Sequence, residues 1–347
     1  MSHQADKSFF DKKREWSERK DRILGSYLAA YLPKMATQGR PILIVDGFAG
    51  PGRFSDGNLG SPLIICANVR KANKRKTKFP VSTRVIAVEK DPDLASELCR
   101  ALAGYDFAEA RWNTFLEISS EIVELLKTHN AFIYMDPWTV SGLDWRAMER
   151  IFSCLSRHVS VEVLLNLNAA AFVRRGLAAL KLPEIPVDEA HEDPLPADRD
   201  TDEPVAIDKL NEIVGGNWWI DRIHKEDGFL NQVTAIVEGY CSQLARYFAE
   251  VGHHGLKAKP SHTIPKYYLI FASRHPDALR LMNDEMVKSR KTLAERARPK
   301  HPMLFETRSE ELVPDLARLP SLVLRTCVKR SLHADRGAWN GFPTLQT

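Results

Sequence analysis

Short apolar runs alternate with amphipathic segments along most of the chain. Runs of about four to eight mainly apolar residues predict buried strands, and they fall at Pro41–Asp46, Val85–Glu89, Ala108–Trp112, Ala131–Met135, Val161–Leu167 and Lys266–Phe271. Apolar residues spaced three to four apart predict helices, at Phe9–Tyr31, Ser61–Ala72, Leu94–Leu102, Phe115–Leu126, Trp145–Leu155 and Val233–Ala249. Because strands and helices alternate, we expect an α/β protein in which a mostly parallel, twisted sheet has helices on both faces.

Two sequence signals predict where helices begin and end. Pro33 should lie beyond the end of the first helix, because proline inside a helix removes a backbone hydrogen bond. Ser61 and Pro62 should begin the second helix, with Ser61 as its N-cap. Ligands of parallel sheets bind beyond the carboxyl ends of the strands, so we expect the functional residues at that edge.

The chain is long enough for one α/β domain with additions. We assign this domain to residues 41–290, after an N-terminal helical extension over 1–40 and before a basic C-terminal extension over 291–347. An acidic insertion lies around residues 181–220. Within it, Glu184–Glu203 carries nine acidic residues and three prolines, a composition that predicts a loop or a lid outside the core.

Composition excludes several classes of protein. Hydrophobic residues make up 44% and charged residues 27% of the chain, and no apolar run approaches the roughly 20 residues that a membrane helix needs. The first residues lack the apolar core of a secretory signal, so we expect a cytoplasmic protein with no membrane partner. The cysteines are scattered and form no C-x-x-C pair, which argues against a disulfide framework and a metal site. We expect all five to be buried and reduced: Cys66, Cys99, Cys154, Cys241 and Cys327.

Basic residues are concentrated in three stretches, although the net charge is only +4. Arg70–Lys78 and Lys288–Lys300 each contain six basic residues, and residues 12–20 contain five more. If these stretches shared one surface they could hold a nucleic acid. Solvated faces of three separate helices are the alternative, and only the fold decides between the two.

A glycine-rich loop follows the first predicted strand. Glycines allow backbone to approach a ligand closely where a side chain would block it. The spacing differs from the G-x-G-x-x-G of dinucleotide sites, and an acidic residue at the strand end suits the cationic amino group of S-adenosylmethionine better than a pyrophosphate. A turn cap is the alternative for this acid. The candidate cofactor-binding residues of this segment are Asp46, Gly47, Phe48, Ala49, Gly50 and Gly52.

Polar residues also end the second and third predicted strands. Glu89 stands where a carboxylate can accept hydrogen bonds from both ribose hydroxyls of an adenosine, and Lys90 follows it. Asn113 comes directly after the third strand, within reach of an adenine edge, although asparagine is also common in turns. We therefore expect these three residues to complete the cofactor site.

The fourth predicted strand ends in Asp136-Pro137-Trp138. In amino-methyltransferases a D-P-P-aromatic motif at this place accepts hydrogen bonds from the target amine, and its aromatic ring stacks on a flipped base. Here Trp138 stands in place of the second proline. We expect Asp136, Pro137 and an exposed Trp138 to form the catalytic site; a helix-capping Asp136 with Trp138 in the core is the alternative.

These motifs together resemble the three-Cys-motif partner protein family. The resemblance rests on D-G-F-A-G-P-G-R, the following D-G-x-x-G-S-P-L-I, the V-E-K-D strand end, the D-P-W turn and the late Y-Y-L-I-F-A-S strand. The family is bacterial, resembles class I S-adenosylmethionine-dependent methyltransferases, and takes its name from a gene partner with a three-cysteine motif like that of radical enzymes. The resemblance implies a Rossmann-like methyltransferase fold and that cofactor. Gly60-Ser61-Pro62 and the Asp136-Pro137 pair show a weaker likeness to ribosomal-RNA adenine N6-methyltransferases, which suggests a nucleic-acid substrate. The candidate substrate-binding residues are Lys20, Arg53 and Ser61.

Two functions are compatible with these residues. We expect methyl transfer from S-adenosylmethionine to an exocyclic amine of a nucleic acid, RNA or DNA, with Asp136 orienting the acceptor. The alternative is an accessory subunit that binds the cofactor for a three-Cys-motif partner protein and transfers nothing itself; the missing second proline favours it and the retained Asp136 opposes it. A nicotinamide oxidoreductase is disfavoured by Asp46, which would repel a pyrophosphate.

Overall fold

An eight-stranded sheet in the order β3-β2-β1-β4-β5-β7-β6-β8 forms the centre of the molecule. The computed structural model describes residues 10–75, 82–156, 158–183, 206–258, 262–297 and 325–326, with the side chains of 290–297 and 325–326 excepted. The strands are β1 (Ile42–Asp46), β2 (Thr83–Glu89), β3 (Ala108–Trp112), β4 (Asn130–Met135), β5 (Val161–Leu167), β6 (Glu250–Leu256), β7 (Tyr267–Ser273) and β8 (Arg325–Thr326).

Strands β1 to β6 run in the same direction, whereas β7 and β8 run in the opposite one. β1 pairs in parallel with β2 and β4, β3 with β2, and β5 with β4. β7 inserts between β5 and β6 and is antiparallel to both. The mostly parallel sheet is therefore confirmed. β6 was not predicted, because its sequence EVGHHGL has two glycines and no alternating apolar pattern.

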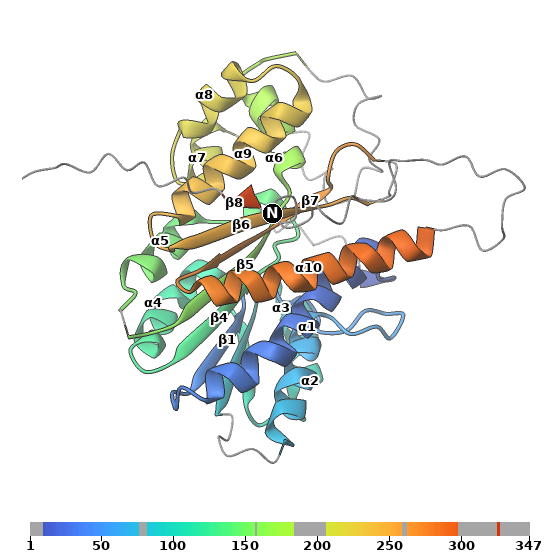
Figure 1. Ribbon diagram of the computed structural model, residues 1–347, viewed down its shortest axis with the longest axis vertical. Helices are drawn as coiled ribbons and strands as arrows, with labels where there is room; N and C mark the ends of the chain where they lie inside the picture. Colours follow the sequence, from blue (N-terminus) through green and yellow to red (C-terminus); the bar gives the residue numbers. More distant parts are fainter. Residues whose placement is uncertain are drawn as a thin grey trace, which may run out of the picture.

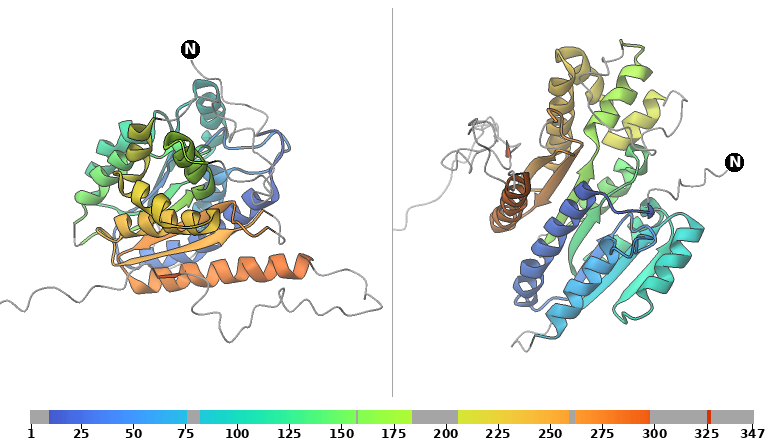
Figure 2. Two further views of the ribbon diagram at one scale, coloured as in Figure 1. Left: turned by 90° about the horizontal axis from the view of Figure 1, so that it is seen from above. Right: turned by 90° about the vertical axis from the view of Figure 1, so that its right-hand side faces the viewer.

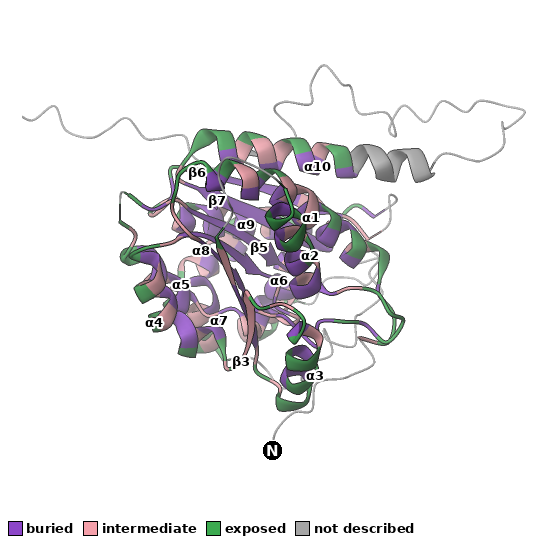
Figure 3. Cartoon of the chain, turned by 90° about the horizontal axis from the view of Figure 1, so that it is seen from below, coloured by how far each residue is buried: buried purple, intermediate pink, exposed green. Residues whose placement is uncertain are grey.

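Helices cover both faces of the sheet (Figures 1 and 2). One face packs against α1 (Glu15–Ala36), α2 (Ser61–Asn73), α3 (Pro92–Leu102) and α10 (Pro276–Ala297). The other packs against α4 (Phe115–Leu126), α5 (Trp145–Ser153), α6 (Ala169–Ala179), α7 (Ile207–Val214), α8 (Trp218–Lys225) and α9 (Phe229–Leu244). Figure 3 shows the central strands buried between these layers, with exposed residues on the outer helix faces. The expected α/β Rossmann-like architecture is confirmed.

The first helix differs from its predicted bounds. It continues through Pro33 to Ala36, whereas the sequence placed its end before the proline. Leu32 and Met35, on either side of Pro33, are buried in the same core as β1 and β4, and this packing offsets the lost backbone hydrogen bond. Within this segment, α1 packs on one face of the sheet.

Two further predictions at helix ends are corrected. Gly60, not Ser61, is the N-cap of α2, because the backbone of Gly60 is still extended there. α10 was not predicted and runs across residue 290, the expected start of the C-terminal extension. Cys66 and Cys241 are buried and reduced as expected, but Cys99 and Cys154 are exposed; Cys327 lies outside the described residues.

The described part of the acidic insertion is helical. α7 and most of α8's first turn fall within residues 181–220, and Leu210 and Trp219 from these helices are fully buried in the core beneath α6 and α9. Glu184–Glu203, for which the sequence predicts a loop or a lid, lies outside the described residues. Among the helices that the structure describes, none is long and apolar enough to cross a membrane.

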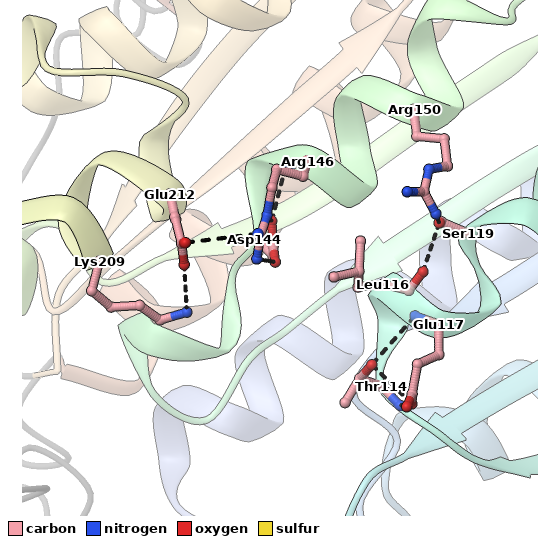
Figure 4. Close-up of polar contacts among 9 residues, drawn as sticks. All are labelled: Thr114, Leu116, Glu117, Ser119, Asp144, Arg146, Arg150, Lys209 and Glu212. Atoms are coloured by element: carbon pink, nitrogen blue, oxygen red, sulfur yellow. Dashed lines mark hydrogen bonds and ion pairs between the residues drawn. The ribbon is translucent and has the colours of Figure 1, made fainter.

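Polar contacts join three helices of this second layer at their surface (Figure 4). Arg150 of α5 donates to the hydroxyl of Ser119 of α4 at 3.0 Å. Arg146 binds Asp144 at the start of α5 at 2.7 Å and lies 3.7 Å from Glu212 of α7. The ion pairs of Arg146 are partly exposed, so each contributes little to stability.

Candidate functional site

The glycine loop after β1 lies against the end of β2. Gly50 and Gly52 have φ angles of +59° and +82°, which only glycine adopts without strain. The backbone of Ala49 donates to the carbonyl oxygen of Val88 at 2.9 Å, and Gly50 donates to Glu89 Oε2 at 2.9 Å. The loop and the end of β2 therefore form one rigid wall.

Glu89 is held by one backbone donor on each carboxylate oxygen. Gly50 N binds Oε2, and Asp91 N binds Oε1 at 2.8 Å. Partial burial raises the pKa of Glu89, and these backbone hydrogen bonds oppose the shift. Because a carboxylate has about four acceptor positions, Glu89 keeps capacity for hydroxyl donors of a ligand.

Asp46 is fully buried at the end of β1. Its Oδ1 accepts a long hydrogen bond of 3.4 Å from the backbone of Phe48, and Oδ2 has no hydrogen-bond partner of ordinary geometry among the described residues. Burial raises the pKa of Asp46 to about 7, while the nearby Ser61 hydroxyl and the Phe48 amide oppose this shift. A buried carboxylate oxygen without a donor marks a place where a cationic or N–H group would be stabilised.

Asp136 is bound by three side chains of the protein. Lys20 Nζ lies 2.7 Å from both Oδ1 and Oδ2, Asn166 Nδ2 donates to Oδ1 at 2.7 Å, and Tyr134 Oη donates to Oδ2 at 3.1 Å. These donors come from α1, β5 and β4. Lys20 and Asp136 thus form a largely buried ion pair, with side-chain exposures of 7% and 18%.

The segment just before α1 forms hydrogen bonds with the loop after Gly52. The backbone of Lys13 donates to Asp56 Oδ2 at 2.9 Å, and its ammonium binds Asp21 and the carbonyl oxygen of Leu59. Ser55 N donates to the carbonyl oxygen of Phe10 at 2.8 Å. Residues 10–21 therefore bridge the glycine loop and Asp136.

Trp138 is half-buried, which corrects the expected exposed ring. It packs edge-on against Phe10, with ring centroids 5.4 Å apart, and contacts Tyr267 together with Trp16. Lys20 Nζ lies 4.7 Å from the centre of the Tyr267 ring, a cation–π distance. Tyr267 thus contacts both the Trp138 ring and the ammonium of Lys20.

Three predicted site residues lie apart from this cluster. Arg53 is exposed and donates to the carbonyl oxygen of Gly57 in its own loop at 2.7 Å. Lys90 is exposed, and its carbonyl oxygen accepts from Trp112 Nε1 at 3.1 Å. The backbone of Asn113 donates to the carbonyl oxygen of Glu89 at 3.2 Å, which keeps it beside the ribose-binding candidate.

The structure adds residues that the sequence pattern did not single out. Asn166 and Tyr134 contact Asp136, and Lys13 and Asp21 lie on the same side of α1. Asn166 could have been found from the sequence. In the strand VEVLLNL it is the one polar residue after Glu162, and it lies near the carboxyl end of that strand. Tyr134 and Asp21 had no such signal. No group of three or more side chains able to hold a metal ion occurs among the described residues.

The described residues of the basic stretches do not all lie at one edge of the sheet. α2 begins beside the glycine loop, where Gly60 N binds the carbonyl oxygen of Gly52, and carries Arg70 to the opposite edge of the sheet. α10 begins beside the end of α1, where Lys34 lies 3.4 Å from Asp277, so its later residues run back toward the start of α1 (Figure 1). The start of α1 and the end of α10 therefore lie beside the carboxyl edge of the sheet, whereas the basic end of α2 does not.

Comparisons with known proteins give a fold and no family. No family model matches the chain, and no curated protein matches it. A Legionella pneumophila protein of the family DUF519 has a TM-score of 0.42 and 9% identity over 80% of this chain and 90% of its own. A Bacillus cereus O-methyltransferase in complex with SAH has 0.33 and 14% over 72% and 80%, and a fibrillarin/Nop5p complex 0.35 and 9% over 69% and 74%. At these values the likeness concerns the fold alone.

The strand order, with β7 antiparallel between β5 and β6, and the glycine loop after β1 define a Rossmann-like fold of the class I S-adenosylmethionine-dependent methyltransferase type. The resemblance to the three-Cys-motif partner family stays a prediction, since no family model matches.

Proposed function

We propose that this protein binds S-adenosylmethionine at the carboxyl ends of β1 and β2 and transfers its methyl group to an exocyclic amine of a nucleic acid. The observation that carries the cofactor is Asp46 Oδ2, which is buried and has no hydrogen-bond partner of ordinary geometry among the described residues. The cationic amino group of S-adenosylmethionine would satisfy this oxygen, whereas a pyrophosphate would be repelled by it.

The residues present fit this cofactor. Glu89 would accept the ribose hydroxyls, because its two oxygens are oriented by Gly50 N and Asp91 N and retain acceptor positions. The loop from Gly47 to Gly52 would lie along the cofactor, and Asn113 would face the adenine. When bound, S-adenosylmethionine supplies an electrophilic methyl group.

On the acceptor side, Asp136 and Lys20 supply the chemistry. Two oxygens provide about four acceptor positions, and Lys20, Asn166 and Tyr134 take them all. An acceptor amine therefore replaces Lys20 on Asp136, and the released ammonium can bind the acceptor's phosphate. Asp136 and the Pro137 carbonyl oxygen would then orient the amine, whose lone pair is poorly nucleophilic while it is conjugated to the ring.

Charge supports a nucleic acid as the acceptor. Lys12 and Arg14 are exposed at the start of α1, near the acceptor side, and Lys288 is exposed on the half of α10 that runs toward the same edge. Phosphate contacts of such residues supply most of the sequence-independent affinity for nucleic acids.

A second candidate is the accessory subunit that presents the cofactor to a three-Cys-motif partner protein. The observation that favours it is the complete occupation of Asp136 by Lys20, Asn166 and Tyr134, which leaves no position for an acceptor unless Lys20 moves. Trp138 in place of a second proline points the same way.

One experiment separates these functions. Calorimetry with S-adenosylmethionine and with NAD on the wild type, Glu89→Ala and Asp136→Asn tests the cofactor, followed by radiolabelled methyl transfer to total bacterial RNA and DNA. We expect Glu89→Ala to weaken cofactor binding about ten- to a hundredfold and Asp136→Asn to bind normally but lose transfer. Preference for NAD would refute the cofactor, and cofactor binding without transfer by the wild type would leave the accessory role.

A further inference from the structure

Asn166 carries an unused hydrogen-bond acceptor beside Asp136. The residue lies near the carboxyl end of β5 and is 2% exposed. Its Nδ2 donates to Asp136 Oδ1 at 2.7 Å, whereas its Oδ1 is buried and has no hydrogen-bond partner among the described residues. Buried amide oxygens are almost always paired, so one that is not calls for an explanation.

The orientation of this amide is fixed by its neighbour. An ionised carboxylate only accepts hydrogen bonds, and Lys20 keeps that of Asp136 in an ion pair. Turning the Asn166 amide over would place its oxygen against Asp136 Oδ1, oxygen to oxygen. The nitrogen therefore faces Asp136, and the oxygen points elsewhere as a preoriented acceptor.

Asn166 lies on the same face of the sheet as the residues that form the proposed substrate site. Asp46, Tyr134 and Asn166 stand on the adjacent strands β1, β4 and β5, and their neighbours on the same strand faces, such as Ile44 and Leu164, pack in the core under α1. The side chain of Asp136 is 18% exposed and the Asn166 amide is its hydrogen-bond partner, so the amide adjoins the position that a ligand of Asp136 would occupy.

We propose that Asn166 is a specificity-determining residue that accepts a hydrogen bond from the N–H of the acceptor's exocyclic amine. This inference rests on the proposed function and adds to it a group that selects the amine. An exocyclic amine offers two N–H donors, one for Asp136 after Lys20 leaves and one for Asn166 Oδ1, which takes the place given above to the Pro137 carbonyl oxygen. A base that lacks the amine leaves Asn166 Oδ1 unpaired, and buried unpaired acceptors are costly.

The test compares two bases in two matched variants. The probes are a single-stranded oligoadenylate and the same oligomer of purine riboside, which lacks the exocyclic amine, with the protein saturated by S-adenosylhomocysteine. Asn166→Leu removes a donor to Asp136 and the unused acceptor, whereas Tyr134→Phe removes only a donor to Asp136. The ratio of the two affinities within each variant is independent of the fraction folded.

We expect the wild type and Tyr134→Phe to prefer oligoadenylate by about tenfold, and Asn166→Leu to keep only the smaller preference that Asp136 supplies. An undiminished preference in Asn166→Leu would overturn the role of Asn166 while leaving the proposed function intact. Equal loss of preference in both variants would show that Asn166 acts only through Asp136, and would also overturn it. Binding of neither oligomer by the wild type would overturn the inference together with the nucleic-acid acceptor.

Discussion

The ammonium of Lys20 lies 2.7 Å from both carboxylate oxygens of Asp136. Lys20 stands on the N-terminal helix and Asp136 follows β4, so 116 residues separate them in sequence. The sequence pointed to Asp136 as the acid that orients an acceptor and to Lys20 as a substrate-binding residue. Because the two are partners, the acceptor of the proposed reaction would have to compete with a residue of the protein itself.

This ion pair should be needed for stability. Lys20→Met leaves the largely buried Asp136 carboxylate without its cation, and removing one partner of a buried pair costs about 3 to 5 kcal/mol; the 18% exposure of Asp136 places the loss at the lower end. Urea unfolding of Lys20→Met, Asp136→Leu and the double variant measures it. We expect the double variant to lose less than the sum of the single ones, and additive losses would argue against the pair.

Stability should fall as the pH rises from about 4 to 7. Burial raises the pKa of Asp46 and Glu162 to about 7 and that of Asp21 to about 6. Because the folded protein binds these protons more tightly than the unfolded chain does, their contribution is complete below the unfolded pKa and is lost as pH rises through the folded one.

Glu162 offers the cleanest test of this pH dependence, since it lies away from the site and Tyr27 donates to it. Glu162→Gln should flatten the curve of unfolding free energy against pH, measured by denaturant titration from pH 4 to 8. Glu97→Gln, on the exposed side of α3, is the control and should leave the slope unchanged. An unchanged slope in Glu162→Gln would contradict the prediction.

Cofactor binding should strengthen as the pH rises through about 7. Burial raises the pKa of Asp46 to about 7, and a cationic amino group near Asp46 Oδ2 favours the ionised form, so binding releases a proton. Calorimetry of S-adenosylhomocysteine binding from pH 6 to 8 measures this dependence. Asp46→Asn should bind more weakly and lose the slope; a wild type without the slope would separate Asp46 from the amino group.

Nucleic-acid affinity should depend on the basic residues at one edge only. Lys12→Ala with Arg14→Ala removes two exposed charges beside the acceptor side, whereas Lys71→Ala with Lys74→Ala removes two exposed charges near the end of α2. Each phosphate contact contributes about 0.7 to the salt slope on a single strand. Titration across salt should show a smaller slope for the first pair and no change for the second. If both pairs of substitutions reduced the salt slope equally, nucleic acid would bind by a general electrostatic attraction and not at this edge of the sheet.

Much of the fold was determined by the sequence itself. The apolar runs at β1, β2, β4 and β5 are buried on both faces, so their composition alone shows them. The same holds for the glycines at Gly50 and Gly52, whose positive φ angles require that residue type. Local signals failed where packing decided the outcome: Pro33 lies inside α1, and β6 forms from a glycine- and histidine-containing segment because β7 offers it a partner.

The candidate site divides in the same way. Asp46, Glu89 and Asp136 could be found from the sequence, because a polar residue that ends a buried strand must lie at the carboxyl edge of the sheet. Which side chains meet there could not. Lys20 reaches Asp136 only because α1 packs across β4 and β5, and the Asn166 amide has one orientation only because Asp136 is its neighbour. Contacts between residues far apart in sequence follow from how the helices pack on the sheet. The order of residue types along the chain does not predict which of these side chains come within hydrogen-bond distance.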